Sequence, residues 1–252
     1  VFNSGFQLNS GVIPTLYGEG DLILADKYCH ASLLDGMHLC NATMKRFQHN
    51  DMTHLKTLLM THRSNFKRCL LVTESLFSMD GDVALLDVLQ QFSYDYDTEL
   101  MVDEAHAIGV LGDQGRGLCS QFGIKPTYLV GTFGKAMGTF GAFIATSNEI
   151  SDYLINRCRA FIYTTALPVP VIAATNQAVS LIQSMDIQRQ RLREISAYFT
   201  SMMSQKGLSL LGNYHILSLI YPGNRALLDR YSQLKDAGIA VSAIRHPTVP
   251  KG

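Results

Sequence analysis

Short apolar runs that alternate with helical patterns constrain the fold more than any other feature of this sequence. Runs typical of buried strands lie at residues 21–26 (DLILAD), 69–75 (CLLVTES), 99–105 (ELMVDEA), 128–133 (YLVGTF) and 141–146 (GAFIAT). Between two of these runs, Leu85, Leu89 and Phe92 recur at i, i+4 and i+7, which places them on one face of a helix. Nearly continuous apolar strands separated by helices predict an α/β fold with a largely parallel sheet covered on both faces.

The last quarter of the chain has a different pattern. Residues 186–207 predict an amphipathic helix that ends at Gly207, and residues 224–238 predict a helix closed by Gly238. Residues 215–222 (HILSLIYP) and 239–244 (IAVSAI) are expected to be strands. We therefore expect a large domain over residues 1–180 and the start of a smaller α+β domain over residues 181–252.

Composition excludes several classes of function. The 252 residues include 21 basic and 21 acidic side chains, so bulk charge does not favour a nucleic acid or an anionic membrane as partner. No apolar run approaches the roughly 20 residues that cross a bilayer. The five cysteines are scattered and form no C-x-x-C pair, so we expect no zinc site and no disulfide framework, and a reducing cytoplasm.

Three polar clusters follow the predicted strands: residues 74–78, Asp103 with His106, and Thr132 with Lys135. Taken alone, Asp103 is explained as a helix cap, His106 as a core histidine and Lys135 as a solvated surface residue. Because ligands of open α/β sheets bind beyond the carboxyl ends of the strands, the three clusters together predict a functional site there.

The segment LMVDEAHAIGVLG (residues 100–112) is similar to the acidic box of an ATPase, which needs a phosphate loop G-x-x-x-x-G-K-[ST] upstream. The only nearby Gly-Lys pair is Gly134-Lys135, and it lies downstream. Leu129 replaces the first glycine of such a loop, and Ala136 replaces its hydroxyl residue. The sequence therefore argues against an ATPase.

Pyridoxal phosphate chemistry requires the residue types found in the three clusters. A lysine holds the cofactor as a Schiff base, and a carboxylate pairs with the pyridinium nitrogen so that the ring stays an electron sink. Hydroxyls and backbone N–H groups, often at a helix N-terminus, hold the phosphate. This chemistry favours Lys135, within GTFGKAMGTFGAF, as a covalent nucleophile.

Motifs along nearly the whole chain resemble the α-oxoamine synthases, pyridoxal phosphate enzymes of the aspartate-aminotransferase fold. They are HASLLDG, VTESLFSMDGD, MVDEAHAIGVLGDQGRG, TFGKAMGTFGA, IYTTALP and AIRHPTVPKG. The resemblance implies a fold-type-I transferase with a mostly parallel, seven-stranded sheet between helices.

The resemblance also implies catalytic roles. Lys135 would hold pyridoxal 5'-phosphate and move the Cα proton, and Asp103 would pair with the pyridine nitrogen. His106 and Ser78 would contact the phenolic oxygen of the ring. His30 would stack on the ring face and border the substrate, although a core histidine is the structural alternative.

Further residues are implied in binding. The phosphate would contact residues from two places in the chain, namely Gly5, Phe6 and Thr132. Thr164 or Thr165 would reach the phosphate of the partner subunit, which implies a homodimer with an active site shared across the interface. Thr248 would face the substrate, and no metal is implied.

Family members condense an amino acid with an acyl thioester. The segments AIRHPTVP and RFQHND favour the branch that joins L-alanine to a pimeloyl thioester carried by CoA or an acyl carrier protein. A sister enzyme that uses glycine and another acyl-CoA remains an alternative, as does a non-catalytic dimer partner of the same fold. The family pattern includes an N-terminal segment and an arginine after VPKG, so we expect the sequence to be cut at both ends.

Overall fold

The computed structural model describes residues 1–246 and 248–249, and the contacts between them divide the chain into two units. Unit 1 comprises Val1–Phe77 and Val83–Arg191, and unit 2 comprises Ser78–Asp82 and Leu192–Gly252. The division at residues 191 and 192 falls inside one helix. The domain limits 1–180 and 181–252 stay a prediction.

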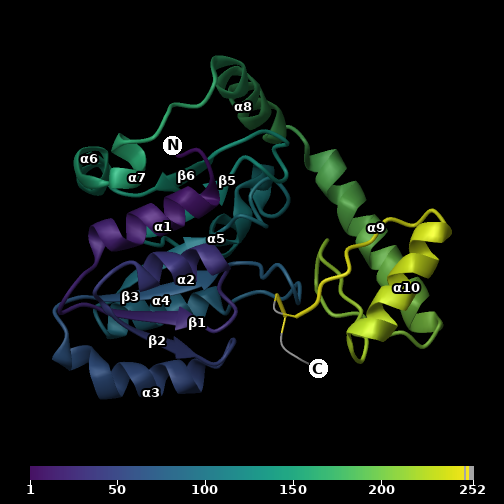
Figure 1. Cartoon of the computed structure of the whole chain (residues 1–252), viewed down its shortest axis with the longest axis horizontal. Coiled ribbons are helices and arrows are strands. Elements are labelled where there is room, and N and C mark those ends of the chain that lie inside the picture. The colour runs from purple at the N-terminus through teal and green to yellow at the C-terminus, as the bar shows by residue number, and fades with distance from the viewer. Residues whose placement is uncertain (247, 250–252) are drawn as a thin grey trace. The chain divides into compact units, whose positions relative to one another are not determined.

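A single six-stranded sheet forms the centre of unit 1 (Figure 1). Its strands are β1 (Leu22–Asp26), β2 (Thr43–Phe47), β3 (Cys69–Glu74), β4 (Glu99–Asp103), β5 (Tyr128–Thr132) and β6 (Ala142–Ala145). The order is β2-β1-β3-β4-β5-β6, and only the β5–β6 pair is antiparallel. The mostly parallel α/β architecture and the five strands expected from the sequence are confirmed.

The edges of the sheet differ from expectation. Strand β2 (TMKRF) was not predicted, because it is a half-exposed edge strand with a lysine and an arginine in place of a continuous apolar run. Beyond β6, the ladder continues only through a bridge between Phe2 and Ala142. The described residues therefore form six strands, one fewer than the resemblance implies.

Helices connect the strands of unit 1 and cover the sheet. They are α1 (Gly5–Leu16), α2 (Ala31–His38), α3 (Met52–His62), α4 (Leu86–Asp95), α5 (Gly117–Phe122), α6 (Asn148–Arg157), α7 (Arg159–Ile162) and α8 (Val169–Ile182), with 3₁₀ turns at Arg63–Asn65 and Asp113–Gly115. Strands β1 and β3 are buried along their whole length, as expected for a sheet covered on both faces. One core cluster joins α1 and α2 to the sheet through residues such as Leu8, Val12, Leu33, Ile23 and Val72.

The predicted helix between β3 and β4 is α4, but its buried face is shifted from the predicted one. Leu86 and Leu89 are buried, whereas Leu85 is the N-cap residue and 44% exposed. A residue at the N-cap lies outside the helical spiral, so the apolar repeat begins one residue later.

Unit 2 contains helices rather than a sheet among its described residues. The predicted helices are confirmed as α9 (Asp186–Gln205), which begins in unit 1, and α10 (Asn224–Asp236), and both Gly207 and Gly238 have positive φ. The strands predicted at 215–222 and 239–244 are wrong: only Leu211 and Ser218 form a bridge. An extended segment becomes a strand only when a partner satisfies its backbone groups, and apolar residues such as Ile220 and Ile239 stay exposed.

Across the part of the chain that the structure describes, no helix combines the length and the apolar character needed to cross a membrane.

Candidate active site at the carboxyl edge of the sheet

Asp103 is the last residue of β4, in the middle of the sheet. It lies in register with Glu74, the last residue of β3, and with Val130 of β5, so it stands at the carboxyl edge of the parallel strands. Its side chain is 7% exposed, and its two carboxylate oxygens have separate donors. Oδ1 accepts from the backbone N–H of Ala105 at 2.9 Å, and Oδ2 accepts from Asn9 Nδ2 at 3.0 Å. The two bonds hold a nearly buried carboxylate in one orientation.

Lys135 lies in the turn after β5, where its carbonyl accepts from the N–H of Gly138 at 2.9 Å. Gly138 has φ +62°, which a residue with a side chain rarely adopts. Lys135 Nζ lies 2.7 Å from His106 Nε2, so the structure brings these two predicted residues together. Although the residue is exposed as a whole, desolvation of its amine lowers the pKa of Lys135, partly offset by Asp103 and Glu74. A lowered pKa favours the neutral, nucleophilic amine.

His30 precedes helix α2 and is its N-cap residue. Its backbone N–H donates to Glu74 Oε1 at 2.6 Å, while its ring accepts from the N–H of Ser32. Desolvation, followed by the negative charge of Asp103, raises the pKa of Glu74 to about 8. Glu74 is thus largely protonated at neutral pH and anchors the His30 backbone beneath the site.

Two of the residues expected at a phosphate group, Gly5 and Phe6, form the N-terminus of α1. Ser4 caps this helix by accepting from the N–H of Gln7 at 3.1 Å, and Gly5 begins it. A Cβ added at Gly5 would meet nothing within 4 Å, and Phe6 is exposed, so this helix end is open. Thr132 donates from Oγ1 to the carbonyl of Gly141 and accepts from the N–H of Gly134.

Thr164 and Thr165 lie beside the same helix end of their own chain. Asn3 Nδ2 donates to Thr164 Oγ1 at 3.0 Å and to the carbonyl of Thr165 at 2.8 Å. Their contact with a partner subunit stays a prediction. Ser78 and Thr248 are described residues of unit 2, so their predicted roles at this site also stay predictions.

Two buried polar residues beside Asp103 were missed in the sequence. Asn9 and Ser32 are buried polar residues joined by a 3.0 Å hydrogen bond, and Asn9 links Ser32 to Asp103. A signal was present for Asn9, because Leu8, Val12 and Ile13 surround it on the buried face of α1. Polar residues on such a face need partners, which indicates a site or a structural network.

Glu104 has a structural role, unlike its neighbour Asp103. It is fully buried and accepts from Ser75 Oγ at 2.8 Å and from the N–H of Leu118 at 3.1 Å. A Cβ at Gly117 would approach the Glu104 carboxylate to 2.6 Å, so the glycine is required for this close packing. Because neighbouring residues at a strand end point to opposite sides, the DEAH segment supplies one acid to the site and one to the fold.

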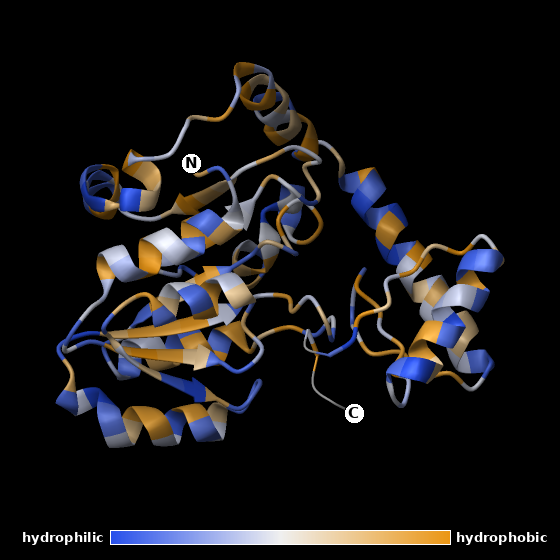
Figure 2. Cartoon of the chain, viewed as in Figure 1, coloured by the Kyte–Doolittle hydropathy of each residue, from blue (hydrophilic) through white to orange (hydrophobic). Residues whose placement is uncertain are grey.

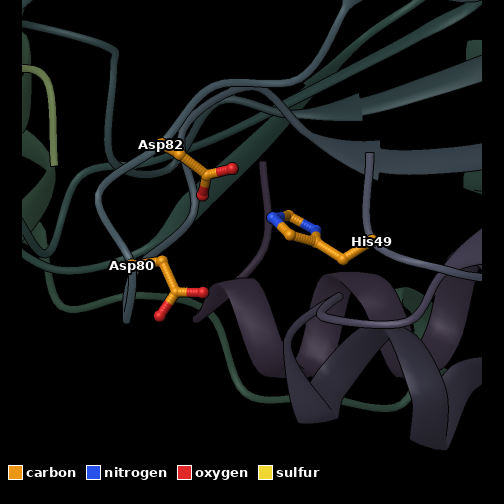
Figure 3. Close-up of side chains that lie close together, drawn as sticks. All are labelled: His49, Asp80 and Asp82. Carbon is orange, nitrogen blue, oxygen red and sulfur yellow. The ribbon is translucent and has the colours of Figure 1, made fainter. Parts of the chain in front are cut away.

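A second polar cluster lies at the end of β1. His49, drawn in Figure 3, places Nδ1 2.9 Å from Asp26 Oδ1 and stacks on Tyr28 with ring centroids 4.3 Å apart. The other oxygen of Asp26 accepts from the N–H of Asn50 at 3.0 Å. Buried Asp26 thereby fixes the loop after β2. Figure 3 also draws two aspartates of unit 2, Asp80 and Asp82.

Comparisons with known proteins agree with this geometry. The 8-amino-7-oxononanoate synthase of Pelobacter propionicus is 43% identical over the whole chain, which spans 65% of that protein's length. The crystal structure of 8-amino-7-oxononanoate synthase from Francisella tularensis is 34% identical, with a TM-score of 0.84 over 98% of this chain and 72% of that one. A solved structure of serine palmitoyltransferase (SPT), with pyridoxal phosphate (PLP) as an internal aldimine, is 29% identical to this chain. Its TM-score is 0.95 over 100% of this chain and 64% of that one.

The fold seen in unit 1 is that of fold-type-I transferases. The aminotransferase class I and II family matches residues 1–252, the entire sequence. The chain therefore belongs to the aminotransferase class I and II family.

Proposed function

We propose that this chain is the core of a pyridoxal 5'-phosphate-dependent acyltransferase that condenses L-alanine with a pimeloyl thioester, with loss of carbon dioxide, to give 8-amino-7-oxononanoate for biotin synthesis. The observation that carries the proposal is the Lys135 amine, which has a lowered pKa and lies 2.7 Å from His106 under the influence of Asp103. The name 8-amino-7-oxononanoate synthase is borne by relatives that are 42–43% identical over the whole chain. This identity supports the choice of reaction.

The residues present fit pyridoxal 5'-phosphate. The open N-terminus of α1 at Gly5 offers backbone N–H groups and the positive end of a helix dipole to a phosphate. Asp103 offers an oriented carboxylate to a pyridinium nitrogen, and Lys135 offers an amine for a Schiff base. When bound, this cofactor supplies an electron sink for negative charge that develops on the substrate Cα.

Each residue then has a task that follows from its position. Lys135 attaches the cofactor, removes the Cα proton of the amino acid and later returns a proton. Asp103, held by Asn9 and the Ala105 N–H, would pair with the ring nitrogen. His106 contacts the Lys135 amine and, with Ser78, would bind the phenolic oxygen.

The remaining residues bind and orient. His30 would stack on the cofactor ring, and Gly5, Phe6 and Thr132 would hold the phosphate. Thr248 would contact the substrate.

A homodimer in the cytoplasm completes the proposal. Helix α8 is coloured mostly as hydrophobic in Figure 2. Most of its residues are nevertheless exposed, with Val169 77% and Ile172 50% exposed. Such a helix needs a covering surface. A second copy placed against it would bring Thr164 and Thr165, just before α8, towards the partner's phosphate site.

A sister synthase with another substrate pair is the alternative that a specific observation favours. The SPT structure has a higher TM-score, 0.95 against 0.84, but a lower identity than the oxononanoate synthase structure. We weigh identity more heavily, because substrate choice depends on side chains while these sister enzymes share the fold. A non-catalytic dimer partner is disfavoured, because it would not need to retain both Lys135 and Asp103.

The test is product formation by the full-length protein with defined pairs of substrates. We expect L-alanine to be preferred over glycine by about 10- to 200-fold in kcat/KM, the range that one methyl group gives in a fitted pocket. We also expect a pimeloyl thioester to be preferred over acetyl-CoA and palmitoyl-CoA, measured by mass spectrometry of the product. Equal use of glycine, or faster reaction with serine and palmitoyl-CoA, would refute the oxononanoate assignment and leave only the family.

A further inference from the structure

His30 carries a hydrogen-bond pattern that fixes the position of its ring proton. The backbone N–H of Ser32 donates to Nδ1 at 3.2 Å, as part of the N-cap of α2. A backbone N–H can only donate, so Nδ1 must hold a lone pair. In the neutral ring, the proton therefore resides on Nε2.

Asn9 sets the direction of the next two hydrogen bonds. Its Nδ2 donates to Asp103 Oδ2 and to Ser32 Oγ, both at 3.0 Å. A carboxylate oxygen only accepts, so the nitrogen of the Asn9 amide faces Asp103. The Ser32 oxygen accepts from Asn9, and its own proton is left to donate to His30 Nδ1, 2.9 Å away.

We propose that Asn9 and Ser32 are positioning residues that hold His30 as a neutral imidazole with its proton on Nε2. The hydroxyl of Ser32 donates to His30, while the two protons of Asn9 Nδ2 are committed to Ser32 and Asp103. Asn9 is 1% and Ser32 2% exposed, so water does not substitute for these partners. The outcome is an exposed His30 ring that presents an N–H donor to an anionic oxygen of a ligand.

The charges around His30 agree with a neutral ring. Desolvation lowers the pKa of His30, and the positive charge of Lys135 lowers it further. Asp103 and Asp35 oppose this shift, and Glu74 accepts the backbone N–H of His30 rather than a ring proton. A proton on Nδ1 would also face the donors from Ser32, which disfavours the charged ring sterically and electrostatically.

Nitrogen NMR of the full-length protein labelled with ¹⁵N-histidine tests the proposal directly. His30→Gln identifies the His30 signals, and the long-range proton–nitrogen pattern reports which ring nitrogen carries the proton. We expect the wild-type ring to be neutral at pH 7 with the proton on Nε2. A ring protonated on Nδ1, or an even mixture of tautomers, would overturn the proposal.

Ser32→Ala measures how much the Ser32 hydroxyl contributes to the pKa of His30. Losing a bond that stabilises the neutral ring should raise the pKa of His30 by about 0.4–1 unit, from a net hydrogen-bond strength of about 0.5–1.5 kcal/mol. Asn9→Ala should give a smaller rise, because Ser32 then loses the donor that reserves its proton for His30. Thr57→Ala, which removes an exposed hydroxyl bonded to the Thr53 carbonyl of α3, is the control and should leave the pKa of His30 unchanged. An unchanged His30 pKa in folded Ser32→Ala contradicts the positioning role.

The catalytic consequence alone rests on the proposed function. The acid limb of kcat/KM against pH should move upwards in Ser32→Ala by the same amount as the pKa measured by NMR. If the His30 pKa measured by NMR changes but the acid limb of kcat/KM does not, the positioning role of Ser32 is supported. The proposed role of His30 in the reaction is then contradicted. The two failures are therefore distinguishable.

Discussion

The two ends of the parallel strands carry similar polar residue types, but these residues differ in their hydrogen-bond partners and pKa shifts. At the carboxyl edge, the Lys135 amine has a lowered pKa, and the pKa of Glu74 is raised to about 8. The His30 ring is exposed, and Asn9 Oδ1 is buried without a hydrogen-bond partner among the described residues. Polar groups at this edge are therefore not all used in hydrogen bonds among the described residues.

At the amino edge, a comparable group of polar side chains is paired internally. Glu99, the first residue of β4, accepts from Tyr17 at 2.7 Å and from Tyr128 at 2.9 Å. Arg68 donates to the same carboxylate at 2.7 Å, and its guanidinium lies 4.4 Å from the centroid of the Tyr17 ring. Burial raises the pKa of Tyr128 to about 12, so both tyrosines stay neutral donors.

The difference separates stability from function along the same strand. Asp103 and Glu99 are the two ends of β4, yet Glu99 is matched by donors from the core, whereas Asp103 lies beside an amine with a perturbed pKa. Structural networks also perturb pKa values, as at Tyr128, so what distinguishes the carboxyl edge is an amine whose pKa is lowered towards a nucleophilic form. We therefore expect substitutions at the carboxyl edge to change activity and those at the amino edge to change stability.

The largest expected effect is that of Lys135→Ala in the full-length protein. Activity should fall by at least about 10³-fold, because cofactor attachment is lost together with proton transfer, which alone contributes about 10²–10⁴-fold. Thermal unfolding of the two proteins without cofactor should show an unchanged or higher Tm, since a desolvated amine is removed. Lys125→Ala, at an exposed surface lysine, is the control. Residual activity within tenfold of wild type would place the chemistry elsewhere.

Asp103→Asn should have the next largest effect. It keeps the shape of the side chain but removes the charge beside the proposed ring nitrogen, so exchange of the alanine Cα proton should slow by about 10²–10³-fold. Cofactor attachment to Lys135 should survive. Proton NMR in deuterated buffer follows the exchange, and exchange at the wild-type rate would show that Asp103 is not the pyridinium partner.

Glu99→Ala tests the amino edge. It leaves two tyrosine hydroxyls and a partly exposed arginine without their shared acceptor, which should lower the free energy of unfolding by about 2–3 kcal/mol. Urea unfolding measures this loss, and kcat per folded molecule should stay within about twofold of wild type, because the edge lies at the far end of β4. A drop in kcat without a loss of stability would contradict the assignment of a structural role to the amino edge.

Glu74→Gln should have the smallest effect, visible as a change in pH dependence. A carboxyl whose folded pKa is raised to about 8 binds its proton more tightly in the folded state, so its contribution to stability is lost as pH rises from about 4.5 to 8. The wild type should lose about 1 kcal/mol relative to Glu74→Gln between pH 6 and pH 7. Urea unfolding at both pH values checks this, and an equal response of the two proteins would mean that Glu74 titrates normally.

The sequence was sufficient to predict the central strands and the cluster at their carboxyl ends. Buried strands are continuous apolar runs, and parallel strands bring Asp103, His106 and Lys135 to one edge. Strand β2 escaped prediction because an edge strand depends on its neighbour more than on its own composition. The apolar run at residues 215–222 lacked a partner ladder and formed only one bridge.

The directions of side chains could not be predicted from the sequence. Nothing in the letters DEAH distinguishes Asp103, which faces the site, from Glu104, which is fully buried against α5. The network of Asn9, Ser32 and His30 joins residues from two helices, and its bonds depend on how α1 packs against α2. Local patterns therefore indicated which strand ends carry polar residues, while tertiary packing decided which of these are buried and what they bond to.

Borohydride reduction of the full-length protein with bound pyridoxal 5'-phosphate tests the central claim most directly. Reduction fixes a Schiff base permanently, and peptide mass spectrometry then locates the modified lysine. A single label on Lys135, absent from Lys135→Ala and retained in Glu99→Ala, is the expected result. Label on Lys125 or on any other lysine, with Lys135 unmodified, would contradict the assignment of the active site to the carboxyl edge.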